Sequence, residues 1–79
     1  MCAEAATAQA IAEARWGEEL EAHLRIDAEL LAAAEMPMGE GRPFRLAAAE
    51  VEHYESAERL LGARIDVILA EAESRRHCG

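Results

Sequence analysis

The positions of the prolines constrain the fold of this chain more than any other feature. Pro37 and Pro43 are the only two prolines in 79 residues, and both lie in the segment 36–43. The flanking runs are rich in Ala, Glu, Leu and Arg, which are strong helix formers. Because proline disrupts a helix interior, we predict one all-α domain over residues 1–79. It is a two-helix hairpin, with one helix at about 3–35, a turn at 36–43 and a second helix at about 44–76.

The apolar residues indicate more apolar surface than two helices can cover. Hydrophobic residues make up 52% of the chain, but 19 of them are Ala, which buries little area. When residues are placed at 100° steps, the stripe of the first helix centres on Leu20 and that of the second on Leu46. Ile26 lies off the first stripe, and we detect no sustained heptad repeat. The main stripe members are Trp16, Leu24, Leu31 and Ala34 on the first helix, and Ala57, Leu60, Leu61, Val67 and Ile68 on the second.

The width of these stripes predicts self-association. Each apolar arc spans roughly 200°, about twice the width that packing against one partner helix requires. We therefore expect two copies to form a homodimer, an antiparallel four-helix bundle. Docking on a larger host protein is the alternative.

The net charge of the chain limits the kinds of partner that it can bind. A net charge of −8 disfavours direct binding to nucleic acid, which requires a basic surface. It fits an acidic soluble protein or one that binds a basic partner. Residues 1–16 lack the features of a secretory signal, and no run reaches the roughly 18 apolar residues of a membrane helix. We expect a cytoplasmic protein without membrane contact.

The cysteines and two central glycines leave alternatives open. A hairpin brings Cys2 and Cys78 together, so a disulfide between them is sterically conceivable, and with His77 they would form a partial zinc site. Because the cytosol is reducing, we expect plain thiols. Gly17 and Gly62 lie near the middle of their helices and mark kinks, close approaches or breaks.

Several polar residues fall on the apolar faces. Folding the chain at residue 40 puts Asp27 level with His53 and about one turn from Glu50, and the i,i+3 spacing of Glu50 and His53 directs both to one side. Two-fold symmetry would double this set to four carboxylates and two imidazoles. The set resembles that of the ferritin-like di-iron carboxylate proteins. The resemblance implies that Asp27, Glu50 and His53 bind iron or another divalent metal, with His23 supporting these ligands. A metal-dependent oxidase activity is expected only if this metal site forms. The preferred interpretation is either a buried or rim ion pair of Asp27 with His53, or a polar seam that sets the bundle register.

Five further residues are candidates for partner binding. Arg64 lies level with Trp16 and about one turn from Glu13. It either contacts an anion or a partner, or it forms a salt bridge to Glu13 or stacks on the Trp16 ring. Trp16 is either an interface anchor or the largest core residue. Met36, Met38 and Phe44 form a soft apolar tip at the turn, which is either a contact surface or an end cap.

The sequence motifs do not favour an enzyme. The chain has no glycine-rich phosphate loop, Cys-x-x-Cys, His-Glu-x-x-His or Gly-x-Ser-x-Gly motif. Two helices also enclose little volume for a ligand. We therefore predict a small acidic, non-enzymatic protein-interaction module without a cofactor. It would be an adaptor, inhibitor or regulator, in size and charge like phage or mobile-element inhibitors, with itself and an unidentified protein as partners.

Overall fold

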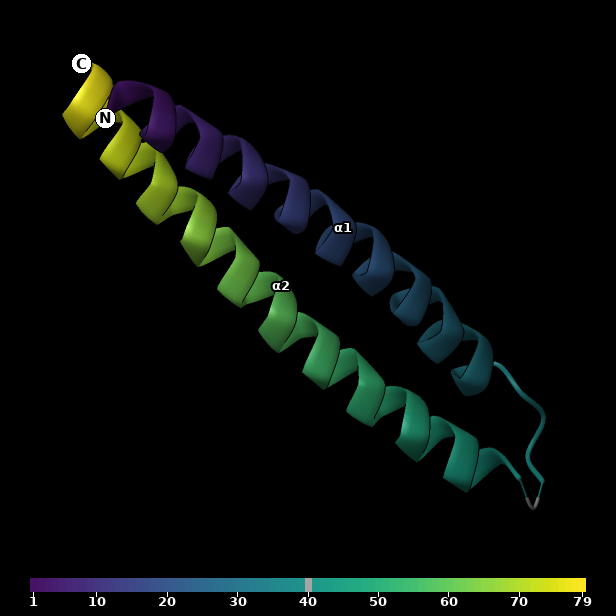
Figure 1. Cartoon of the computed structure of the whole chain (residues 1–79). Coiled ribbons are helices and arrows are strands. Elements are labelled where there is room, and N and C mark those ends of the chain that lie inside the picture. Colours follow the sequence, from purple (N-terminus) through teal and green to yellow (C-terminus); the bar gives the residue numbers. More distant parts are fainter. Residues whose placement is uncertain (40) are drawn as a thin grey trace.

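The chain folds into two long antiparallel helices. The computed structural model describes residues 1–39 and 41–79; Glu40 of the predicted turn lies outside the described residues. Helix α1 spans Cys2–Ala34 and helix α2 spans Arg42–Cys78. They lie side by side, with the N- and C-termini at the same end (Figure 1). The result is a rod of 58 × 14 × 13 Å, so the predicted all-α hairpin is confirmed.

The residues around the connection explain where the helices begin and end. Helix α2 begins at Arg42 rather than Phe44, with Pro43 in its first turn, where a missing N–H is tolerated. Helix α1 has no basic residue in its last turn. Arg42 supplies one from α2: its Nη2 donates a hydrogen bond to the Ala34 carbonyl oxygen at 3.0 Å. This places a positive charge at the negative end of the α1 dipole.

The helices meet along a seam in which the less exposed residues recur at alternating spacings of three and four. This is a heptad repeat, the pattern of a coiled coil, and our expectation that no heptad is sustained is wrong. The seam residues of α1 are Ala5, Gln9, Ala12, Trp16, Glu19, His23, Ile26, Leu30 and Ala33; those of α2 are Leu46, Ala49, His53, Ser56, Leu60, Ala63, Val67, Ala70 and Ser74.

The face predicted for α1 is also partly wrong. Leu24 and Leu31, placed on the packed stripe, are both 58% exposed, whereas Ile26, placed off it, is half-buried in the seam. The predicted stripe followed the largest apolar residues, but the seam is built largely from small and polar ones. In addition, a fixed 100° step drifts by about 20° per heptad from a 3.5-residue repeat. On α2 the two patterns coincide better, since Val67 is 2% exposed as expected.

Small side chains dominate the α2 side of the seam. Every second seam position carries Ala or Ser: Ala49, Ser56, Ala63 and Ala70. The distance between packed helices depends on the side chains at the contact, so these residues allow a close approach. The cost is a thin core, because the buried hydrophobic residues of the described chain are Ala5, Ala33, Ala63 and Val67.

The two central glycines interrupt neither helix. Gly17 lies inside α1 and Gly62 inside α2, and a Cβ built on either residue meets nothing within 4 Å. Glycine in a helix interior costs roughly 0.5–1 kcal/mol relative to Ala. We therefore expect Gly17→Ala and Gly62→Ala each to raise the free energy of unfolding by about 1 kcal/mol, measured by urea denaturation. A loss of stability in either variant would contradict this open environment.

The termini are joined covalently. Cys2 and Cys78 form a disulfide, with Cα atoms 4.9 Å apart, inside the usual range of about 4.4–6.8 Å. The expectation of plain thiols is therefore wrong, and so is the partial zinc site, because both sulfur atoms are used. Two helices of similar length, joined by a short connection, end level with each other, and this brings the two cysteines within bonding distance.

Candidate functional site

A cluster of polar side chains lies in the middle of the seam. Nδ1 of His23 and Oγ of Ser56 share a hydrogen bond at 3.0 Å, and Ser56 is fully buried. The rings of His23 and His53 have centroids 4.9 Å apart, and Nε2 of His53 lies 3.2 Å from Oδ1 of Asp27. The cluster therefore links α1 to α2 through both imidazoles.

The cluster contains part of the predicted metal site. Asp27 and His53 meet, as folding at residue 40 predicts, but Glu50 is exposed. Among the described residues, no group of three His, Cys, Asp or Glu side chains is placed to hold a metal ion. The geometry within one chain is that of an ion pair beside a hydrogen-bonded histidine, and it does not support the di-metal alternative.

The His23–Ser56 hydrogen bond can be tested by substituting Ser56, the one buried polar residue of the described seam. We expect Ser56→Ala to lower the free energy of unfolding by about 1–2 kcal/mol, because the His23 nitrogen loses its partner where water has poor access. Thermal and urea unfolding measure the change. The matched control is Ser74→Ala, which changes the other serine of the α2 seam near the end of the helix. Equal losses in the two variants would show that the hydrogen bond contributes nothing.

Trp16 and Arg64 meet at the edge of the seam. The guanidinium carbon of Arg64 lies 5.3 Å from the centroid of the Trp16 ring, within the range of a cation–π interaction. Trp16 is half-buried. The structure thus gives the stacked arrangement, in which the indole packs between the helices.

Only two of the three residues of the predicted apolar tip at the turn are exposed. Met38 is 87% exposed and Phe44 82% exposed, so both are open to a partner. Met36 is half-buried and contributes instead to a hollow between the helices.

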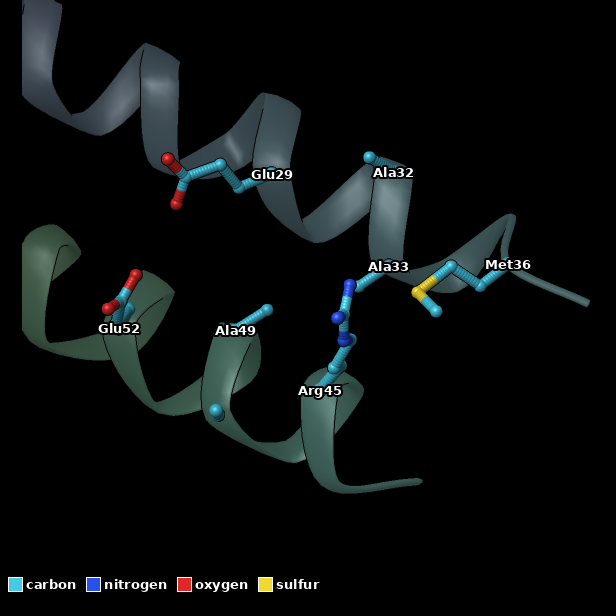
Figure 2. Close-up of a pocket in the computed structure, with 8 residues that line it drawn as sticks. Glu29, Ala32, Ala33, Met36, Arg45, Ala49 and Glu52 are labelled. Atoms are coloured by element: carbon cyan, nitrogen blue, oxygen red, sulfur yellow. The ribbon is translucent and has the colours of Figure 1, made fainter. Parts of the chain in front are cut away.

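That hollow has a volume of about 470 Å³. Figure 2 shows Glu29 on α1 and Glu52 on α2 on facing sides of it, while Arg45 extends from α2 toward Ala33. Alanines from both helices form much of its lining. Carboxylates and a guanidinium in an open depression suit contact with a polar surface.

Inter-helix ion pairs mark the side of the rod that carries this hollow. Glu29 and Glu52 lie two heptads from Arg15 and Asp66, respectively, so all four occupy the same side of the seam. Apart from the Asp27–His53 pair of the polar cluster, the inter-helix ion pairs of the described residues are Arg15–Asp66 at 3.4 Å and Arg59–Glu19 at 3.5 Å. Exposed pairs of this kind contribute roughly 0–1 kcal/mol each. This side is therefore charged and solvated.

The rest of the rod exposes large apolar side chains. Their number is high for a chain of this size, and the total accessible surface of 5795 Å² compares with about 4,700 Å² for a compact protein of this mass. Sequence reasoning placed Leu61 and Ile68 in the packed stripe; the three–four spacing of the seam would have separated them from it. The exposed set within the helices is Ile11, Leu24, Leu31, Phe44, Val51, Tyr54, Leu61, Ile65, Ile68 and Leu69.

Comparisons with known proteins identify no relative of this chain. No protein-family model matches the chain, and neither the curated proteins nor the solved structures contain a significant match. Neither α1 nor α2 contains an apolar stretch long enough to cross a membrane.

Proposed function

We propose that this chain is a small non-enzymatic protein-interaction module, acting as an adaptor, inhibitor or regulator through the apolar faces of its helices. Its first partner is a second copy of itself, and the two hairpins form a four-helix assembly. The observation that carries this proposal is the row of large apolar residues that the hairpin leaves exposed, from Val51 at 55% to Leu61 at 62% and Tyr54 at 69% exposure.

The balance between covered and exposed residues supports the proposal. The buried hydrophobic residues of the described seam are three alanines and Val67, while nine larger Leu, Ile, Val and Tyr side chains are exposed: Ile11, Leu24, Leu31, Val51, Tyr54, Leu61, Ile65, Ile68 and Leu69. Burial of apolar surface yields about 25 cal/mol per Å², so most of the stabilisation available to these side chains requires another molecule. Exposed apolar patches of this kind mark interaction sites.

The charge supports a second kind of partner. The chain carries 16 acidic residues against eight arginines, and the ion-paired side of the rod presents carboxylates such as Glu29 and Glu52 around its hollow. Complementary charge accelerates association and suppresses wrong partners. A regulated target would accordingly be basic. The cytoplasmic location stays a prediction.

Native mass spectrometry on protein purified without chelator tests the proposal. A metal-free dimer is the expected result. A metal-free monomer up to high micromolar concentration would contradict self-association. A dimer that carries metal in a fixed ratio would contradict the non-enzymatic interpretation and would favour the di-metal alternative through Asp27, Glu50 and His53.

A further inference from the structure

Helix α2 carries a second heptad stripe on its outer side. Its residues recur at alternating spacings of three and four, like those of the seam, and all of them are exposed in the hairpin. We call this set the outer stripe: Phe44, Ala47, Val51, Tyr54, Glu58, Leu61, Ile65, Ile68 and Ala72. Eight of these nine residues are apolar or aromatic, so the outer stripe is more apolar than the α2 seam, which contains His53, Ser56 and Ser74.

We infer that the outer stripe is the dimer interface, in which α2 pairs antiparallel with α2 of a second copy. The inference rests on the self-association proposed above and names its surface. At 100° per residue, the outer stripe lies about 150° around α2 from the seam. The two α2 helices are therefore the inner pair, and each α1 lies on the outside of the assembly.

The surface area supports a second copy as the occupant. The rod exposes 5795 Å², about 1,100 Å² more than a compact protein of its mass. A standard protein interface buries about 800 Å² on each partner. One more copy would thus cover most of this excess surface.

The layering of the outer stripe limits the possible registers of the pair. In the hairpin, each seam layer joins one α1 and one α2 residue whose numbers have a constant sum, as in any antiparallel coiled coil. The same rule applied to two outer stripes allows a register with its two-fold axis at Ser56. Its layers pair Phe44 with Ile68, Val51 with Leu61, and Tyr54 with Glu58 across the dimer.

The flanking charges favour this register over the next one. On one flank of the outer stripe, Glu50 faces Arg64 of the second copy, twice by symmetry, and Ala57 faces its own copy at the axis. On the other flank, Glu55 faces Glu55 of the second copy, which is a single like-charge contact. The neighbouring heptad register instead places Glu50 opposite Glu71, a like-charge contact. Opposite charges at flanking positions set partner choice and orientation in coiled coils.

Matched variants test the interface, with the dimer dissociation constant measured by analytical ultracentrifugation. We expect Leu61→Glu to weaken the dimer at least 100-fold. Leu24→Glu is the control, because Leu24 is 58% exposed and Leu61 62%, yet Leu24 lies on the outer helix α1. It should change the constant less than threefold. Equal weakening by both variants would overturn the inference while leaving self-association intact.

A gain of affinity keeps the test independent of folding defects. Glu58 is the one charged residue of the outer stripe, so Glu58→Leu should tighten the dimer at least tenfold. Glu52→Leu makes the same change on the charged side and should leave the constant within twofold. No tightening by Glu58→Leu, or equal tightening by both variants, would overturn the inference.

The antiparallel orientation has its own measurement. Spin labels on Glu55→Cys and on Ala72→Cys, with the Cys2–Cys78 disulfide kept oxidised, report the distance between equivalent residues of the dimer. At 1.5 Å per residue, the positions at 72 should be separated by about 48 Å along the helix axis and those at 55 by about 3 Å. Similar short distances for both labels would show a parallel pair and would overturn the inference.

Discussion

Reduction of the Cys2–Cys78 disulfide is expected to lower the free energy of unfolding by about 4.5 kcal/mol, the chain-entropy value for a loop of this length. The two cysteines are 76 residues apart in sequence, so the bond restricts almost the entire unfolded chain. A core of this size supplies only roughly 3–5 kcal/mol. The reduced hairpin should therefore be marginally stable, with a Tm lower by about 20–30 °C.

Thermal and urea unfolding with and without reductant measure this change, at one fixed protein concentration because association also adds stability. Cys2→Ser, Cys78→Ser and the double variant serve as controls. Each lacks the bond, so all three should match the reduced protein and should not respond to reductant. A single variant that keeps the stability of the oxidised protein would show that the disulfide does not stabilise the hairpin.

Enlarging the most deeply buried alanine of the described seam should have the second largest effect. Ala63 is 0% exposed and lies between the two helices. Ala63→Leu adds three carbon atoms where alanine permits close approach, and overpacking of this kind costs about 1–3 kcal/mol. We expect a loss near 3 kcal/mol, because the seam has few flexible side chains that can move aside.

Urea denaturation checks this value against Ala28→Leu, which makes the same change at an exposed position of α1. The control should shift the free energy of unfolding by less than about 0.5 kcal/mol. An unchanged or increased stability of Ala63→Leu would mean that the seam has unfilled space beside Ala63.

The hairpin and its internal pairings follow from simple rules that the sequence displays. Two prolines in one segment locate the reversal, and folding there predicts that Asp27 meets His53 and that Arg64 meets Trp16; both contacts are present. These predictions depend only on residue levels along the rod, which antiparallel helices of similar length preserve.

The face of α1 was harder to predict, for a physical reason. Leu24 and Leu31 dominate any hydrophobicity pattern, yet the hairpin packs through Ala5, Ala12 and Ala33 instead. Close approach of backbones and disulfide closure select the small residues, and neither effect scales with side-chain hydrophobicity. The His23–Ser56 hydrogen bond could not be predicted either, because a serine within a helix adds nothing to a hydrophobicity pattern.

A seam of regularly spaced small residues leaves the alignment of the two helices weakly determined. After a slip of one heptad, the small residues of α2 would again face the same row of α1, which is Gln9, Trp16, His23 and Leu30, and one helix would have moved by about 10.5 Å. Such a slip would separate the Cα atoms of Cys2 and Cys78, now 4.9 Å apart, beyond the roughly 7 Å that a disulfide can bridge. The oxidised chain therefore has a single alignment, whereas the reduced chain has neighbouring alignments as competitors. Oxidation thus selects which side chains share a level, and with them the geometry of every surface that the rod presents.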